Sequence, residues 1–424
     1  MNPGRITLGL LVVTALAIAV GYLVGVGLQD QSTAEAAGGK RVEPNGIAPD
    51  RYVYYPGTEV LPEDEIRVTA CGTGLPAARR GQAASCFLIE LGNGDKFFFD
   101  LGTGSMANVA GYMIPMDFLT KVFISHLHTD HFGDLAALWA GGWTGGRTEP
   151  LQVWGPSGTR EDMGTAYAIE HFLKAYNWDY MTRAAMISPV PGSITVHEFD
   201  YKAVNQVIYD ENGVVIRSFP AIHAGDGPVS LTLEWNDYKI VYSGDTLPTT
   251  WMLEYAKNAD VVIHEVMPMP EDLVKFYNQP PQLGIRASCG FHTCPPAFGK
   301  IMSELEPKLA IAFHWFNEEG TRYNQFSGIR QTYDGPVSMA TDNMVWNIRR
   351  DGIEERMAVI TEDAWDVPGP GIPLDPDRTR ASEYTDYVLA GLFDTTEAER
   401  QTVDEYNKMF GLEPVPYKPK KPGS

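Results

Sequence analysis

The stretch Val122-Phe-Ile-Ser-His-Leu-His-Thr-Asp-His-Phe132 decides how this chain is interpreted. Its first residues are apolar and predict the last part of a β-strand. His126 and His128 follow at alternate positions of an extended chain, which project to one side, so both imidazoles can bind one metal ion. Asp130 and His131 come next, in a turn that can present them to a second ion. Polar groups that are costly to bury rarely gather without a shared partner, and the stretch therefore predicts a metal site.

Short apolar runs separated by turns continue on both sides of this stretch. We expect strands at 66–71, 86–91, 96–100, 121–125, 214–219, 229–235, 239–243 and 260–265. We expect helices at 134–140, 160–176, 250–258, 296–306 and 323–332. Strands interspersed with helices over about 300 residues predict a layered α/β domain.

The residues from 126 to 131 resemble the His-x-His-x-Asp-His motif of the metallo-β-lactamase superfamily. The segments 71–74 (Cys-Gly-Thr-Gly) and 99–104 (Phe-Asp-Leu-Gly-Thr-Gly) resemble the family's opening strands and turn. His223, Asp245 and His314 lie at expected strand ends, in the order of the family's later ligands. The likeness extends from residue 66 to residue 348. It implies an α/β fold of four layers, αββα, with an insertion and a C-terminal extension.

The resemblance also implies a role for each ligand. It assigns a first metal to His126, His128 and His223, a second to Asp130, His131 and His314, and places Asp245 between the two. Two zinc ions suit these nitrogen and oxygen ligands best, and iron or manganese would also be compatible. A hydroxide between the metals would attack a phosphorus, sulfur or carbonyl centre. The chain is therefore expected to hydrolyse a phosphoester, a sulfate ester, or an acyl or lactone bond.

Within the superfamily, the sequence resembles the ribonuclease Z and arylsulfatase-like branch most. The marks are Glu265, at an expected strand end, and His292, before an expected helix. In that branch the histidine helps to protonate the leaving group, so His292 is expected as the proton donor and Glu265 as the carboxylate that orients it. Together with Asp130 they are the expected catalytic residues, and His264 is expected to be a core residue or a residue that supports the ligands from behind. The chain also resembles exported relatives from guanitoxin-type biosynthetic clusters.

Two alternatives stay open: a ribonuclease Z-like phosphodiesterase that acts on RNA, and a non-hydrolytic mono-iron oxygenase or binding member of the superfamily. The 33 basic and 54 acidic residues leave a net charge of −21, without a basic run in the body of the chain. This charge would repel a polyanion, so it argues against nucleic acid and favours a small-molecule substrate. A β-lactamase is disfavoured because Asp245 stands where that branch typically carries a cysteine ligand. The oligomeric state cannot be inferred.

The N-terminus predicts export. The segment 6–28 is almost wholly apolar, and a membrane-spanning helix needs ~20 such residues. We expect residues 1–29 to be a membrane anchor or a signal peptide, with the catalytic part outside the cytoplasm, either anchored or secreted to the periplasm or beyond. Residues 30–62 are expected to form a linker, 63–362 the hydrolase domain, and 363–424 a C-terminal extension that wraps around it.

Residues 141–215 are expected to form an insertion or lid within the hydrolase domain. Their aromatic stretch 171–180 suits a wall of the substrate pocket, and equally a helix that packs its aromatic side chains on the core. The segment 267–286 is expected to contribute to the pocket as well. Four cysteines complete the pattern: the pairs Cys71 and Cys86, and Cys289 and Cys294, could each form a disulfide or remain free.

Overall fold

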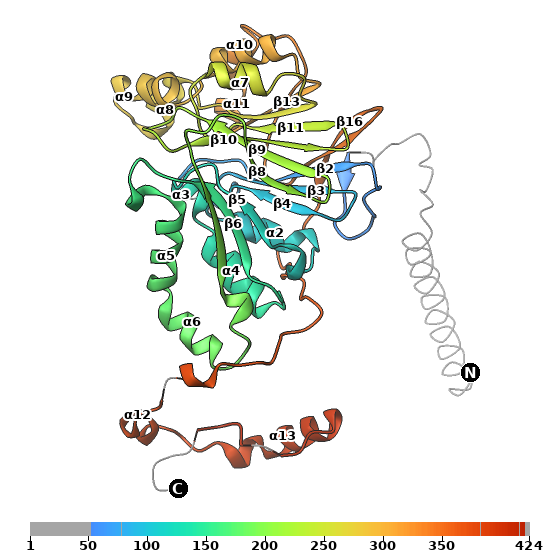
Figure 1. The fold of residues 1–424 in the computed structure, drawn as a ribbon, viewed down its shortest axis with the longest axis vertical. Coiled ribbons are helices and arrows are strands. Elements are labelled where there is room, and N and C mark those ends of the chain that lie inside the picture. Colours follow the sequence, from blue (N-terminus) through green and yellow to red (C-terminus); the bar gives the residue numbers. More distant parts are fainter. Residues whose placement is uncertain (1–51, 78, 382, 415, 420–424) are drawn as a thin grey trace, which may run out of the picture.

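The computed structural model describes residues 52–419, apart from 78, 382 and 415 (Figure 1). The expected anchor at 1–29 and most of the expected linker lie outside the described residues. Within the described part, no helix combines the length and the apolar character that crossing a membrane requires. The membrane attachment and the export of the chain therefore stay predictions.

Two β-sheets stacked face to face form the centre of the molecule (Figure 1). The nine strands of the first sheet are, in spatial order, β1 (Val53–Tyr54), β16 (Gly352–Ala358), β15 (Met344–Arg349), β2 (Ile66–Gly72), β3 (Cys86–Leu91), β4 (Lys96–Phe99), β5 (Lys121–Phe123), β6 (Leu151–Pro156) and β7 (Ile194–Phe199). The seven strands of the second are β14 (Val337–Met339), β13 (Leu309–Phe313), β12 (Val261–Glu265), β11 (Tyr238–Tyr242), β10 (Val229–Trp235), β9 (Val214–Pro220) and β8 (Gln206–Glu211).

The central strands, such as β2 and β3, are buried on both faces. Their alternate side chains point to opposite sides of the sheet, and each side is covered by another layer. Phe87 and Phe123 point toward the second sheet, where Phe87 packs edge-on against Phe313 of β13 with ring centroids 5.2 Å apart. Their neighbours Leu88 and Val122 point outward into a second apolar cluster. This double burial explains why the strands appear in the sequence as nearly continuous apolar runs.

Helices cover the outer face of each sheet (Figure 1). The first sheet carries α2 (Ser105–Val109), α4 (Leu135–Thr144) and α5 (Thr165–Ala175), which share its outer apolar cluster. The second sheet carries α7 (Thr250–Tyr255), α10 (Pro295–Leu305) and α11 (Glu319–Ile329). This order of layers is αββα, and the predicted fold class is confirmed.

The segment 141–215 is built differently from the expected insertion. It supplies β6 and β7 to the first sheet and β8 to the second, so it is part of the sandwich. Phe172 of α5 and Tyr180 of α6 (Asn177–Ala184) pack on α4, with Phe172 5.6 Å from Trp139 and Tyr180 5.4 Å from Trp143 between ring centroids. The aromatic stretch 171–180 is expected to form either a pocket wall or a helix packed on the core, and the structure shows the packed helix.

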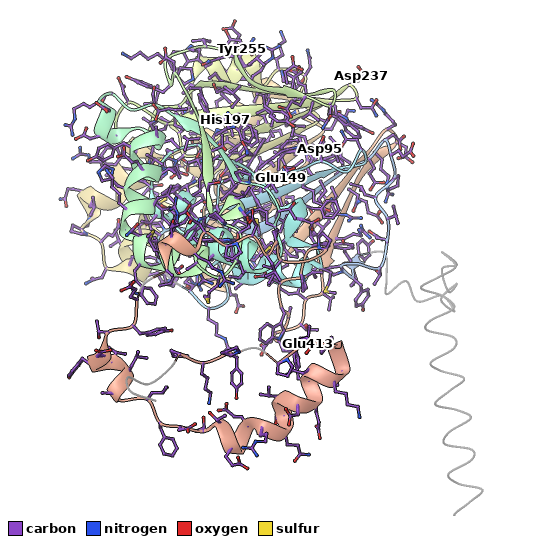
Figure 2. All side chains as sticks on the ribbon, turned by 60° about the horizontal axis from the view of Figure 1, so that its bottom comes forward. Asp95, Glu149, His197, Asp237, Tyr255 and Glu413 are labelled. Atoms are coloured by element: carbon purple, nitrogen blue, oxygen red, sulfur yellow. A yellow bond between two sulfur atoms is a disulfide. The ribbon has the colours of Figure 1, made fainter. Side chains whose placement is uncertain are left out.

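The C-terminal segment has two parts. Its first part follows the helical layer of the first sheet, where the amide of Ser188 donates to the carbonyl of Pro373 at 2.9 Å. Its second part holds α12 (Asp386–Ala390) and α13 (Thr396–Phe410), neither of which has a buried residue. Both helices stand apart from the sandwich in Figure 1, and Glu413 lies away from it in the rotated view of Figure 2.

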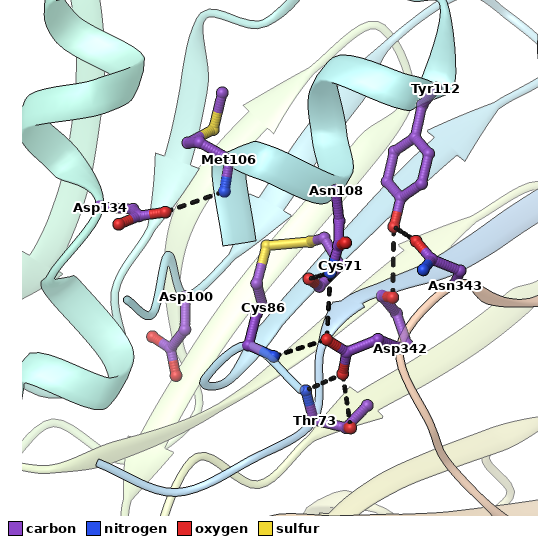
Figure 3. The surroundings of a disulfide bond; sticks show 12 residues. Cys71, Thr73, Cys86, Asp100, Met106, Asn108, Tyr112, Asp134, Asp342 and Asn343 are labelled. Carbon is purple, nitrogen blue, oxygen red and sulfur yellow. Dashed lines mark hydrogen bonds between the residues drawn. A yellow bond between two sulfur atoms is a disulfide. The ribbon is translucent and has the colours of Figure 1, made fainter. Parts of the chain in front are cut away.

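A buried disulfide and a partly buried carboxylate fasten the turn between β2 and β3 (Figure 3). Cys71 and Cys86 form the disulfide, and both are fully buried. Beside them, Asp342 accepts hydrogen bonds from the amides of Thr73 at 3.0 Å and Ala83 at 2.6 Å, and from the Thr73 hydroxyl at 2.8 Å. These contacts hold the turn that precedes β3 against the loop after β14.

The Asp342 carboxylate predicts a pH-dependent contribution to stability. Burial raises the pKa of Asp342 to about 6 from its ordinary 3.8, although its hydrogen bonds oppose the shift. Because the folded-state pKa is the higher one, this contribution is complete below about pH 4 and is lost as the pH rises through about 6. Asp342→Ala also leaves buried amides without an acceptor, which costs about 2–4 kcal/mol.

We therefore expect the stability advantage of wild type over Asp342→Ala, measured by urea unfolding, to shrink between about pH 4 and pH 7. The exposed Asp363 offers a matched control, since Asp363→Ala should change stability little at any pH. A difference for Asp342→Ala that does not vary with pH would contradict the assignment.

Candidate metal centre

The expected ligands gather at one edge of the sandwich, just beyond the ends of strands from both sheets. His126 and His128 follow β5, His223 follows β9, Asp245 follows β11, and His314 directly follows β13. Asp130 and His131 lie on α3 (Thr129–Phe132), a single helical turn that begins after His128. The structure thus brings together residues that are far apart in the sequence, such as His126 and His314, which are 188 positions apart.

The first set of ligand atoms belongs to His126, His128, His223 and Asp245, which lie within 4.8 Å of one another. Nδ1 of His128 lies 3.1 Å from Nε2 of His126 and 3.2 Å from Nε2 of His223. Three neutral imidazoles that converge in this way cannot all donate to one another, because each has only one N–H. A cation at their centre satisfies all three lone pairs.

The second set belongs to Asp130, His131, Asp245 and His314, all of them buried. Nε2 of His314 lies 3.2 Å from Asp130 and 3.4 Å from Asp245, and Nε2 of His131 lies 3.2 Å from the other oxygen of Asp245. Asp245 is therefore shared by both sets. Backbone strain accompanies this arrangement, since His314 has a left-handed φ of 67° and its amide is held by the carbonyl of Thr73 at 2.9 Å.

The charge balance of the cluster fits a divalent metal. Among the described residues, Asp100, Asp130 and Asp245 have no lysine or arginine within salt-bridge distance, only histidines. Burial would lower the pKa of His131, but Asp245 and Asp100 raise it well above its ordinary value. By contrast, burial lowers the pKa of His126 well below its ordinary value and keeps it neutral, as a metal ligand must be. Within the described structure, the buried carboxylates of the cluster thus lack a lysine or arginine to balance their charge, and the neutral imidazoles offer lone pairs that can bind a cation.

A second layer of contacts fixes the ligand rings. Asp100 bonds Nδ1 of His131 at 2.6 Å, and it accepts from the hydroxyls of Ser125 at 2.6 Å and Tyr242 at 2.7 Å. Nδ1 of His223 bonds the carbonyl of Phe291 at 2.9 Å. Such partners set the tautomer and the orientation of a ligating histidine, so that its other nitrogen faces the metal.

The expected proton donor lies beside the two ligand sets. Nδ1 of His292 contacts Glu265 at 3.0 Å and lies 3.7 Å from Asp245. Burial would lower the pKa of His292, but Glu265, and to a smaller extent Asp245, raise it to about 9. His264 is buried and bonds the carbonyl of Glu265 at 2.7 Å, as expected for a core residue.

Comparison with known proteins agrees with this geometry. The family model described as "Beta-lactamase superfamily domain" matches residues 114–315. Ribonuclease Z from Mycobacterium sp. (strain KMS) is 31% identical over 235 residues, which cover 54% of this chain and 76% of that protein. Ribonuclease Z from Mycobacterium marinum is 29% identical over 234 residues, which cover 54% of this chain and 78% of that protein.

The chain belongs to the ribonuclease Z branch of the metallo-β-lactamase superfamily. It is a metal-dependent hydrolase. The crystal structure of the metallo-β-lactamase fold protein YhfI from Bacillus subtilis shares its fold, with a TM-score of 0.51 and 19% identity over 67% of this chain and 100% of that chain. The segment of the hydrolase that the family model matches contains every expected ligand, from His126 to His314.

A cavity of about 550 Å³ opens onto both ligand sets of the hydrolase. Among the described residues, its lining includes no lysine or arginine and no residue of 141–215, and a lid formed by that segment stays a prediction. The apolar wall instead comes from Leu75, from Met267, Leu273 and Tyr277 of the segment that holds α8 (Pro270–Tyr277), and from Phe316. Tyr277 stacks on Phe316 with ring centroids 3.9 Å apart. The expected contribution of residues 267–286 to the pocket is confirmed.

Sequence reasoning did not assign a role to Asp100, although it lies in a segment that resembles the family. The position of Asp100 in the sequence could have indicated its role, because Asp100 directly follows β4. β4 pairs in parallel with β5, and Ser125 and the first histidines follow the end of β5. Polar residues at the carboxyl ends of adjacent parallel strands lie side by side. The pairing itself could not be read from the sequence.

We expect Asp100→Asn to weaken metal binding about 10–100-fold, because the ring of His131 loses the carboxylate that orients it. Titration of the purified hydrolase with a competing zinc chelator measures this change. Tyr242→Phe is the matched control, since it removes one hydrogen bond to Asp100 and leaves the contact with His131 in place. Unchanged metal affinity in a folded Asp100→Asn variant would refute this role.

Proposed function

We propose that this hydrolase uses two divalent metal ions, preferably zinc, to cleave a phosphodiester bond in a small, partly apolar substrate. The observation that carries the proposal is the arrangement of two four-residue ligand sets that share Asp245 and face one cavity. A site for one metal would not need the second set. Histidine nitrogens and carboxylate oxygens are ligands that zinc prefers, although iron or manganese would also suit them.

The residues around the cavity suit hydrolysis of a diester. Bound metal ions supply Lewis-acid polarisation and a water of lowered pKa. Asp130 and Asp245 contact both His131 and His314. These contacts fix the positions of the two imidazoles. His292 lines the same cavity, and Glu265 occupies its Nδ1, so its Nε2 is free to give a proton to the departing oxygen.

The cavity lining supports a small substrate with an apolar group. Leu75, Met267, Leu273 and Phe316 form one apolar cluster against which Tyr277 packs. Such a wall gains free energy by covering an aromatic or aliphatic group and offers no cation for a second phosphate. RNA is the second candidate substrate, favoured by the relatives named ribonuclease Z. The net charge of −21 and a cavity lining that holds no lysine or arginine among the described residues support the small diester instead.

Two variants test the metal site and the proton donor independently of each other. We expect Asp245→Ala to lose bound metal and turnover together, because it removes a ligand from both sets. We expect His292→Gln to keep its metal while kcat falls about 10²–10⁴-fold, the usual size of general-acid catalysis. Elemental analysis of zinc and the hydrolysis of bis(p-nitrophenyl) phosphate measure both quantities. Full metal content and full turnover in Asp245→Ala would overturn the proposed site.

The apolar wall predicts a preference among substrates. Wild-type hydrolase should have about a tenfold lower KM for bis(p-nitrophenyl) phosphate than for methyl p-nitrophenyl phosphate, since the larger diester covers more of the wall. Tyr277→Ala should reduce this difference, whereas Tyr323→Ala, which changes an exposed tyrosine outside the cavity lining, should not. Cleavage of a structured RNA with a higher kcat/KM than either diester would favour the second candidate.

A further inference from the structure

A second disulfide closes a short loop that carries part of the active site. Cys289 and Cys294 are joined, and between them lie Gly290, Phe291, His292 and Thr293. We propose that this disulfide is a redox-sensitive positioning device, whose reduction by a dithiol releases the loop and lowers turnover. The inference rests on the proposed function through the role of His292 as proton donor.

Three consecutive residues of the loop contact the site. The carbonyl of Phe291 accepts from Nδ1 of His223 at 2.9 Å, so the loop orients a ligand of the first set. His292 contacts Glu265 at 3.0 Å. Thr293 then donates its hydroxyl to the carbonyl of Thr246 at 2.6 Å, one residue after Asp245. A displacement of this loop would disturb both the proton donor and a metal ligand.

Apart from the contacts of Phe291, His292 and Thr293, and the full burial of Thr293, much of the loop faces the solvent. Cys289 and Gly290 are exposed, and Phe291 and His292 are only partly buried. Residues 287–291, which include the first part of the loop, form a π-helical turn. After Cys294 the chain continues into two prolines that have no N–H to donate. The disulfide links the first and last residues of this weakly packed stretch, and without it the loop regains conformational freedom.

The two disulfides differ in access to solvent. Cys71 and Cys86 are fully buried, whereas Cys289 is exposed at the protein surface. A dithiol can therefore attack the Cys289–Cys294 bond selectively. Its thiolate attacks the sulfur of Cys289, and Cys294 leaves as a thiolate that takes up a proton. The second thiol of the reagent then displaces Cys289, so the reagent is oxidised to a cyclic disulfide and the protein gains two thiols.

The test compares oxidised and reduced protein of the full chain. Wild type is treated with dithiothreitol, desalted without oxygen and reloaded with zinc, and peptide mass spectrometry after alkylation of a sample identifies the free cysteines. Two readouts follow: kcat and KM for bis(p-nitrophenyl) phosphate, and hydrogen exchange of the Met267 amide, which donates to the carbonyl of Thr293 at 2.9 Å. The exchange readout does not depend on activity. Cys289→Ala/Cys294→Ala, carried through the same treatment, controls for effects of the reagent on the metals.

We expect reduction to free Cys289 and Cys294 alone, to lower kcat at least tenfold with little change in KM, and to accelerate exchange at Met267. Reoxidation should restore both readouts. The double variant should start with the low kcat and should not respond to the reagent. Reduced wild type that keeps its kcat and its protected Met267 amide overturns the inference. If oxidised wild type cleaves no diester, the proposed function fails, while the exchange at Met267 still decides whether the disulfide holds the loop.

Discussion

The carboxylate of Asp245 is the group on which the rest of the site depends. It is buried, has no lysine or arginine partner in the described structure, and lies between two sets of histidine and aspartate ligands. A buried negative charge without compensation would be strongly destabilising, so this arrangement requires cations beside it. The sandwich supplies the geometry, because strands of both sheets end at the edge where the ligands are held.

Support for the ligands comes from three directions. Asp100, which follows a strand of the first sheet, bonds the imidazole of His131, and Tyr242 of the second sheet donates its hydroxyl to Asp100. The orientation of this ligand therefore depends on the packing of one sheet against the other. The loop closed by Cys289 and Cys294 holds a third part, including the expected proton donor. The cavity that Tyr277 lines also borders ligands of both sets.

Local patterns made much of this predictable. The ligands from His126 to His131 are adjacent in the sequence, and the buried strands leave continuous apolar runs, so both could be recognised without a structure. The αββα order followed from a family resemblance that the fold and the relatives confirm. What could not be predicted depends on contacts between distant segments. The aromatic stretch 171–180 suits a pocket wall and a packed helix equally well, and only the position of Trp139 and Trp143 shows which it is.

Anomalous diffraction from crystals loaded with zinc tests most directly the proposal that two metal ions share Asp245. Data collected above and below the zinc edge should give two peaks of similar height. One should lie among His126, His128 and His223, the other among Asp130, His131 and His314, with a carboxylate oxygen of Asp245 next to each. A single peak in one set, with the other ligand set empty at saturating zinc, would contradict the account.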